Sequence, residues 1–258
     1  MSQEEKNDQR PEVIQSEKWV RVRFGGETIA DSRNTLLLRA QGRLPVYYFP
    51  PADVARERLH EEPAGTEVTE QGEGPWPDPP AGARVYTIRA GAAVAENAVW
   101  MVPEESTTYP KLAGYVAFAW QAMDAWFEED HQIRVHPHDP YHLVDVRASS
   151  RHVRILLHGE PVAETRRPVL VFETGLPVRY YIPKMDLRLE LLEEGERTTH
   201  CAYKGTAPHY SVRLPDGNLV ENVAWTYPFP NPGYGDLQNL VAFYQERVKE
   251  FYVDGEKL

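Results

Sequence analysis

Cysteine is almost absent from this chain, because Cys201 is the only one among 258 residues. A single cysteine excludes an internal disulfide framework, and it excludes a structural zinc site built from cysteine pairs. A chain of this length buries enough apolar surface, as one large domain or two ordinary ones, to fold without either device. We therefore expect neither a bound metal nor another cofactor.

Long apolar runs and positive charge are also in short supply. No apolar stretch approaches the ~20 residues that a membrane-spanning helix needs, and the first 17 residues lack the apolar segment of a secretory signal. Lysine and arginine number 28 against 39 aspartates and glutamates, a net charge of −11. Such a balance argues against nucleic acid or an anionic membrane as the main partner. These absences predict a cytoplasmic protein.

Proline and aromatic residues, by contrast, are plentiful. The chain has 22 prolines, 14 tyrosines and 6 tryptophans. Aromatic residues favour strands and proline favours rigid turns, so the composition indicates a mainly β protein rather than a helix bundle.

The sequence repeats itself once. "VRVRFGGETIADS" at 20–32 resembles "VRILLHGEPVAET" at 153–165, and "VYYFPPAD" at 46–53 resembles "RYYIPKMD" at 179–186. Near the end of each half, "ENAVW" at 96–100 resembles "ENVAW" at 221–225. The repeat predicts two copies of one domain that pack together as an intramolecular pseudo-dimer. We place the parts as follows: a polar tail at 1–16, the first domain at 17–130, a His/Pro-rich linker at 131–149 and the second domain at 150–254.

Each copy reads as antiparallel strands followed by one helix. The Gly-Gly and His-Gly pairs near the start of the copies, and "LPDGN" in the second, are hairpin signals. A helical period appears only towards the end of each copy. It places on one helix face the residues Leu112, Tyr115, Val116, Ala119, Met123 and Trp126, and in the second copy Leu237, Leu240, Val241, Tyr244, Val248 and Phe251. The expected unit is an antiparallel β domain closed by a C-terminal α-helix.

The two copies differ most around the cysteine. "THCAYKG" at 199–205 occurs in the second copy alone, and the first has a longer, unrelated connection there. Lys204 or a neighbouring histidine could lower the pKa of the Cys201 thiol and equip it for nucleophilic chemistry. In the other reading Cys201 is a small buried hydrophobe, and strand alternation turns it to the same side as Tyr203 and away from Lys204.

Long motifs carry a family resemblance. "THCAYKGTAPHYSV", "ENVAWTYPFP" and "RPVLVFETGLPVRYYIP" are similar to the bacterial family called domain of unknown function 427, in its tandem form. The resemblance implies a β-tent-like fold, related to methionine sulfoxide reductase B and Yippee-type domains. Many β-tent proteins hold zinc on two Cys-x-x-C pairs, which this chain lacks. A nucleotidyltransferase label attached to the family finds no supporting motif here.

Aromatic and basic residues of the second copy are the candidate ligand contacts, since β-tent relatives hold small ligands in aromatic pockets. The tentative catalytic residues are Cys201 and Lys204. The candidate ligand-binding residues are Arg179, Tyr181, His200, Tyr203, Tyr210, Trp225 and Tyr227. Several of the aromatic residues have counterparts in the first copy, which equally suits a role in the core.

Histidines are concentrated in the predicted linker. A cluster of this kind can bind metal, but Pro137 and Pro140 interrupt any regular face, so we do not assign a metal site to it. The four histidines are His131, His136, His138 and His142.

Three functions remain open from the sequence. The first is a small-molecule-binding module with an aromatic and basic pocket in the second domain. The second is an enzyme that uses Cys201 or Lys204 for nucleophilic or acid–base chemistry. The third is a structural pseudo-dimer that acts through partner contacts.

Overall fold

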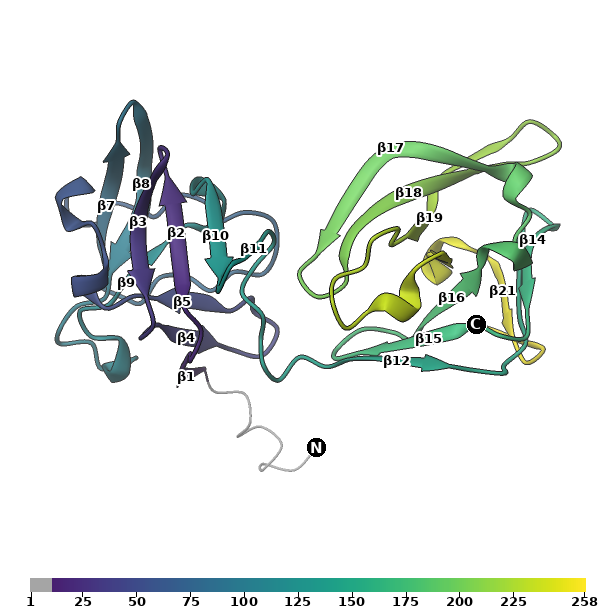
Figure 1. Cartoon of the computed structure of the whole chain (residues 1–258), viewed down its shortest axis with the longest axis horizontal. Helices are drawn as coiled ribbons and strands as arrows, with labels where there is room; N and C mark the ends of the chain where they lie inside the picture. Colours follow the sequence, from purple (N-terminus) through teal and green to yellow (C-terminus); the bar gives the residue numbers. More distant parts are fainter. Residues whose placement is uncertain (1–10) are drawn as a thin grey trace. The chain divides into compact units, whose positions relative to one another are not determined.

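The computed structural model describes residues 11–258. The chain forms two compact units, Met1–Asp139 and Pro140–Leu258, drawn in purple to teal and in green to yellow in Figure 1. Antiparallel strands build both units, and the helical segments of residues 11–258 are 3₁₀ turns of three residues. The prediction of a mainly antiparallel β protein is confirmed.

The first unit contains eleven of the strands. They are β1 (Glu12–Gln15), β2 (Val20–Phe24), β3 (Glu27–Ser32), β4 (Leu36–Arg39), β5 (Val46–Tyr48), β6 (Leu59–Glu61), β7 (Arg84–Ala90), β8 (Ala93–Met101), β9 (Val116–Phe118), β10 (Ala125–Glu128) and β11 (His131–Ile133). The 3₁₀ turns are η2 (Pro51–Asp53), η3 (Arg56–Arg58), η4 (Pro110–Leu112) and η5 (Trp120–Ala122).

The second unit contains the other strands. They are β12 (Val144–Ala148), β13 (Val153–Leu157), β14 (Glu160–Thr165), β15 (Val169–Glu173), β16 (Arg179–Pro183), β17 (Leu192–Cys201), β18 (Gly205–Arg213), β19 (Leu219–Thr226), β20 (Leu240–Phe243), β21 (Glu250–Val253) and β22 (Glu256–Lys257). Its 3₁₀ turns are η6 (Lys184–Asp186), η7 (Leu189–Leu191), η8 (Gly235–Leu237) and η9 (Gln245–Arg247).

Strand pairing follows the same order in both units. The second unit has a seven-stranded sheet, β12-β15-β16-β20-β19-β18-β17, and a four-stranded sheet, β14-β13-β21-β22. In the first unit two smaller sheets, β1-β4-β5 and β9-β8-β7-β6, together repeat the order of the seven-stranded sheet, and a bridge between Phe49 and Val116 joins them. The remaining sheet, β3-β2-β10-β11, repeats the order of the four-stranded sheet of the second unit. In the smaller sheet of each unit an early strand pairs with a late one: β2 pairs with β10, where Val20 lies opposite Glu128, and β13 pairs with β21, where Val153 lies opposite Val253.

Local details recur at matching positions. The β2–β3 hairpin turns at Gly25 and Gly26, and the β13–β14 hairpin turns at His158 and Gly159, all four with positive φ. Positive φ at both central positions is the requirement of the tight turn that matches strand twist. The Gly-Gly and His-Gly signals therefore mark real hairpins.

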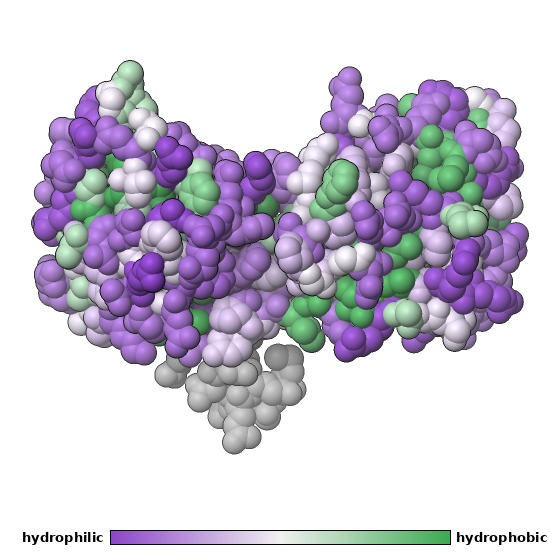
Figure 2. Space-filling view, in the orientation of Figure 1, coloured by the Kyte–Doolittle hydropathy of each residue, from purple (hydrophilic) through white to green (hydrophobic). Residues whose placement is uncertain are grey.

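Apolar side chains fill the interior of each unit, and hydrophilic residues cover most of the surface visible in Figure 2. The first unit has one continuous core cluster that contains Tyr48, Trp100 and Phe118. The second unit has two clusters: one with Tyr180, Val223 and Phe251, the other with Tyr181, Trp225 and Tyr227. Neighbours along one strand, such as Tyr180 and Tyr181, point to opposite faces. The seven-stranded sheet thus carries an apolar cluster on each face.

The predicted C-terminal α-helices are wrong. Each segment is instead a strand between two 3₁₀ turns, η4-β9-η5 and η8-β20-η9, followed by β10 or β21. Strands β9 and β20 are buried at every residue, so they show no period of two and mimic a helix in the sequence. Gly114 and Asn239, just before these strands, have φ of +73° and +62°, a conformation that an α-helix interior does not accommodate.

The predicted tail and linker contain strands as well. Strand β1 lies within the predicted tail 1–16 and pairs with β4, with Val13 packed into the core. Residues 1–10 of that tail lie outside the described residues. Strands β11 and β12 lie within the predicted linker 131–149. Strands β1, β11 and β12 are edge strands of three to five residues, so each offers too few residues for its pattern to stand out from a loop.

No helix within residues 11–258 is long and apolar enough to cross a membrane.

Candidate functional site

One face of the seven-stranded sheet in the second unit carries most of the predicted site residues. Tyr181 lies opposite Ala242, Ala242 opposite Trp225, and Trp225 opposite His209. Directly opposed residues project to the same side of a sheet, so Tyr181, Trp225 and His209 share one face. We call it the aromatic face. Its apolar cluster is Val171, Tyr181, Ala207, Trp225, Tyr227, Leu237, Leu240 and Ala242, with Cys201, Tyr234 and Tyr244 packed against it.

A tight turn between β17 and β18 holds Cys201 in place. The side-chain Nδ2 of Asn231 donates to the carbonyl oxygens of Ala202 at 3.2 Å and Tyr203 at 3.0 Å. Its backbone nitrogen donates to the carbonyl of Lys204 at 3.0 Å. The backbone nitrogen of Lys204 in turn donates to Cys201 Sγ at 3.4 Å. The half-buried thiol therefore accepts a hydrogen bond from the backbone of a turn that Asn231 holds in place.

Lys204 anchors this turn to the end of β15. Its Nζ forms an ion pair with Glu173 Oε2, and both side chains are only 8% exposed. The other carboxylate oxygen of Glu173 lies 3.2 Å from His142 Nε2, and the His142 ring stacks on Tyr203 with centroids 4.5 Å apart. Strand alternation does not continue through Lys204, because the chain turns after Cys201. The buried lysine and carboxylate are therefore held by a network that also contains one histidine.

Hydrogen-bonded aromatic residues occupy the centre of the aromatic face. Trp225 Nε1 donates to the Tyr181 hydroxyl oxygen at 3.1 Å. Burial raises the pKa of Tyr181 and of Tyr227, and the negative charge of Glu173 acts in the same direction. Both phenols stay protonated at neutral pH and can donate hydrogen bonds.

Arg179, which lies opposite Val171 of β15, rests over two aromatic rings of this face. Its Nη1 and Nη2 donate to the two carboxylate oxygens of Glu246 at 2.6 and 2.9 Å. The guanidinium carbon is 5.6 Å from the Trp225 ring centroid and 5.9 Å from that of Tyr244, within cation–π range. Hydrogen bonding from Arg179 holds the pKa of Glu246 below its ordinary value.

His209 is fully buried beside these rings. Its Nε2 lies 2.9 Å from Thr199 Oγ1, whereas Nδ1 has no hydrogen-bond partner within residues 11–258. Burial lowers the pKa of His209, and the positive charges of Arg197 and Arg247 lower it further. The imidazole is therefore neutral, with one nitrogen left to bond.

Two predicted ligand contacts do not lie on the aromatic face. His200 is exposed on β17, where its Nδ1 lies 3.0 Å from Thr206 Oγ1. Tyr210 packs against the core cluster of the opposite face, with the Lys184 ammonium 6.0 Å from its ring centroid. The structure places the other predicted residues on or beside the aromatic face. Tyr181, Trp225, Tyr227 and Cys201 belong to its cluster or pack against it, Arg179 lies over Trp225, and Tyr203 and Lys204 lie in the turn after Cys201.

Sequence reasoning missed five residues that contact the predicted ones. They are His142, Glu173, His209, Tyr244 and Glu246. The sequence does contain a signal for them. When the two copies are aligned beyond their identical motifs, some positions hold a polar or aromatic residue in the second copy and an aliphatic residue in the first.

That contrast is visible in the first unit. Its Tyr48–Trp100 hydrogen bond, at 3.2 Å, matches the Tyr181–Trp225 bond. Around it, however, small and aliphatic residues replace the polar and aromatic ones. By strand register and sequence alignment, Ala40, Val46, Val85, Val102 and Ala119 stand where the second unit has Glu173, Arg179, His209, Tyr227 and Tyr244.

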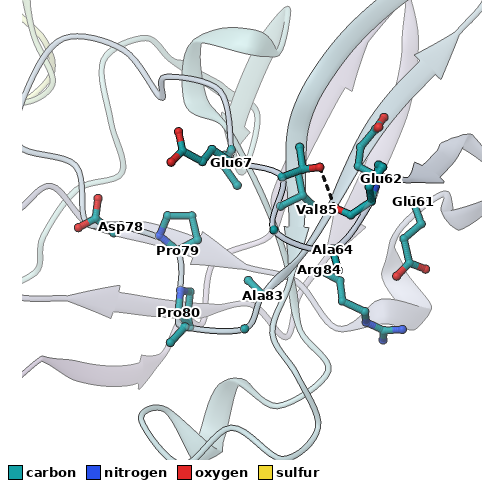
Figure 3. Close-up of a pocket in the computed structure, with 16 residues that line it drawn as sticks. Glu61, Glu62, Ala64, Glu67, Asp78, Pro79, Pro80, Ala83, Arg84 and Val85 are labelled. Atoms are coloured by element: carbon teal, nitrogen blue, oxygen red, sulfur yellow. Dashed lines mark hydrogen bonds between the residues drawn. The ribbon is translucent and has the colours of Figure 1, made fainter.

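A proline-rich loop replaces the β17–β18 turn in the first unit. The loop and the start of β7 enclose an open cavity of about 750 Å³. Figure 3 shows Pro79 and Pro80 on one wall, with Glu61 and Glu62 on the other. The cavity has no thiol and no lysine, so the groups around Cys201 have no equivalent there.

The histidine-rich segment does not form a metal centre in the part of the chain that the structure describes. Within residues 11–258 no group of three or more histidine, cysteine, aspartate or glutamate residues is arranged to hold a metal ion. His142, the last of the four histidines, pairs with Glu173 instead.

The chain belongs to the family described as domain of unknown function, DUF427. The family model matches two segments, residues 12–129 and 145–254. The predicted family is therefore confirmed, with one match in each unit. A comparison with curated proteins finds no match.

Proposed function

We propose that the second unit binds a small molecule on its aromatic face. One observation carries the proposal: the two units share strand order and register, yet the second replaces aliphatic residues with Arg179, His209, Tyr227 and Tyr244 around a common Tyr–Trp hydrogen bond. Buried polar groups cost stability when they serve only packing. Their presence where the first unit manages without them favours a binding role.

The first unit supplies the reference for a test. In the full chain, Arg179→Val, His209→Val and Tyr244→Ala together restore the residues of the first unit. A small-molecule library is screened by thermal shift against the wild type and this triple variant. Ligands of the aromatic face raise the melting temperature of the wild type and not that of the variant. Tyr244→Ala alone serves as the milder variant if the triple one does not fold.

A matched control lies on the other face of the same sheet. Tyr210→Phe and His200→Gln together change residues outside the aromatic face and should leave every ligand-induced shift intact. A screen in which no ligand distinguishes the triple variant from the wild type contradicts the proposal.

An enzyme based on Cys201 is the second candidate. The clamped turn, the backbone N–H 3.4 Å from Cys201 Sγ and the adjacent Lys204–Glu173 ion pair favour it. The rate of Cys201 alkylation against pH tests it, since a thiolate primed for attack titrates well below the ordinary thiol value of ~8.5. A thiol that resists alkylation in the folded protein rules this candidate out.

We further propose that the units arose by tandem duplication of one β-tent-like domain. The shared strand order, the recurrent turns and the two family matches support it.

A further inference from the structure

Arg179 and Glu246 form a fork-to-fork ion pair of unequal burial. Two parallel N–H···O bonds join them, the geometry in which arginine recognises a carboxylate. The Arg179 side chain is 18% exposed and rests over Trp225 and Tyr244, whereas the Glu246 side chain is 54% exposed, in the turn η9. Arginine is thus the fixed partner, and glutamate is the partner that can leave.

Releasing Glu246 into water costs little. The Glu246 side chain is already 54% exposed, so water readily replaces the hydrogen bonds that its carboxylate gives up. Arg179 would keep its two aromatic contacts, which do not depend on Glu246. The result is a preorganised guanidinium whose two donors are open to another carboxylate.

Two arginines, Arg179 and Arg247, lie beside the Tyr244 ring, although the whole chain has a net charge of −11. The Arg247 guanidinium is 5.9 Å from the Tyr244 ring centroid and donates to the carbonyl oxygens of Asn222 and Glu221 at 2.7 and 2.9 Å. The positive charges of Arg197 and Arg247 both lower the pKa of buried His209. An anion that replaces Glu246 therefore meets a favourable local field.

The fold itself does not require this ion pair. In the first unit, Val46 and Gln121 occupy the positions that match Arg179 and Glu246, and no charge stands at either. The neighbouring strands keep the same register without it.

We infer that Glu246 is an internal substitute for the ligand's own carboxylate. The ligand of the aromatic face is then a small carboxylate with a flat apolar body: its carboxylate displaces Glu246 from Arg179, and its body lies against the half-buried Tyr244 ring. The inference rests on the proposed function and adds the chemical class of the ligand.

Benzoate is the probe, with phenyl phosphate and benzyl alcohol as comparisons, each titrated into the full chain and followed by NMR. Glu246→Gln removes the competing charge and should tighten benzoate binding by up to about fivefold, which corresponds to the ~1 kcal/mol upper limit for an ion pair with an exposed partner. Arg179→Val should abolish the binding, and so should Arg179→Lys, which keeps the charge and loses the fork.

The matched control is another fork-to-fork pair on the same unit. Arg213, at the end of β18, donates to Glu193 of β17, with Nη2 and Oε2 3.0 Å apart, and neither residue belongs to the aromatic cluster. Glu193→Gln makes the same change in net charge as Glu246→Gln and should leave benzoate binding at the wild-type level.

Several outcomes overturn the inference. They are no benzoate binding to the wild type and Glu246→Gln, equal tightening by Glu193→Gln, binding retained in Arg179→Val, or phenyl phosphate bound more tightly than benzoate. If benzyl alcohol binds as well as benzoate, and the triple variant loses both, the carboxylate inference fails while the proposed function stands. The proposed function fails separately, when no library compound distinguishes the triple variant.

Discussion

Trp225 and Tyr181 meet edge to face, with ring centroids 6.1 Å apart, and the indole N–H donates to the phenol oxygen. Trp100 and Tyr48 do the same in the first unit, at 6.3 Å. This arrangement is therefore scaffold that both units use. What distinguishes the second unit is the set of charged and polar groups placed around it.

Tyr181→Phe should destabilise the second unit. The change leaves the buried Trp225 N–H without its acceptor, which costs about 1–3 kcal/mol. Urea unfolding followed by tryptophan fluorescence measures the loss, and Tyr48→Phe should cause a similar loss in the first unit. Tyr210→Phe, on the other face, is the control. A Tyr181→Phe protein as stable as the wild type would show that the hydrogen bond contributes nothing.

Lys204→Met should be among the most damaging single changes in the turn. It leaves the Glu173 carboxylate buried without its cation, and such a loss costs about 3–5 kcal/mol. Adding Glu173→Ala, the residue type at the matching position of the first unit, should recover part of the stability. The double-mutant cycle measures the coupling in urea, with exposed Lys249→Met as the control. Additive effects of the two changes would contradict a direct ion pair.

The stability of the second unit should fall as the pH drops below about 6.5, the ordinary pKa of histidine. The folded-state pKa of His209 lies below that value, so the unfolded chain binds a proton first. The stability contributed by neutral His209 is complete above the unfolded pKa and is lost as pH falls towards the folded pKa. His209→Val should flatten this part of the profile, whereas His200→Gln should not. An unchanged slope in His209→Val would assign the pH dependence to other groups.

Gly205→Ala should destabilise the β17–β18 turn more than Gly217→Ala destabilises the next one. Both glycines have positive φ, of 109° and 89°. A Cβ at Gly205 would also lie 3.2 to 3.4 Å from atoms of Asn231 and Phe229, whereas one at Gly217 would meet nothing within 4 Å. The steric term adds to a backbone strain of about 1–3 kcal/mol. Equal melting temperatures for the two variants would mean that the clamp around Gly205 yields freely.

The sequence predicted those parts of the fold that depend on neighbouring residues, such as the tight hairpin turns. Both hairpins, at Gly25 and Gly26 and at His158 and Gly159, followed from turn chemistry. The spacing of apolar residues led to a wrong helix prediction at β9 and β20. A strand buried on both faces has no alternation of apolar and polar residues that would distinguish it from a helix. The left-handed residues Gly114 and Asn239 were the overlooked breaks.

The site was harder to derive because its contacts are distant in sequence. Arg179, Tyr181 and Trp225 were candidates by residue type, and their shared face emerges only from the pairing of β16, β20 and β19. In the sequence Glu173 is an ordinary polar residue at the end of a strand, and only the structure shows that the turn with Lys204 reaches it. Which carboxylate neutralises a lysine 31 residues away depends on tertiary structure, and no local pattern encodes it.

The pairing of β13 with β21 has a consequence for synthesis. β13 needs β21 to complete its sheet, and Val153 and Val253 are partners across nearly the whole second unit. As the chain leaves the ribosome, the β13–β14 hairpin forms early but keeps an open edge until the final residues emerge. Such long-range closure slows folding and exposes a pairing edge meanwhile. A chain stalled shortly before residue 250 would therefore carry an almost complete second unit that is still prone to aggregate.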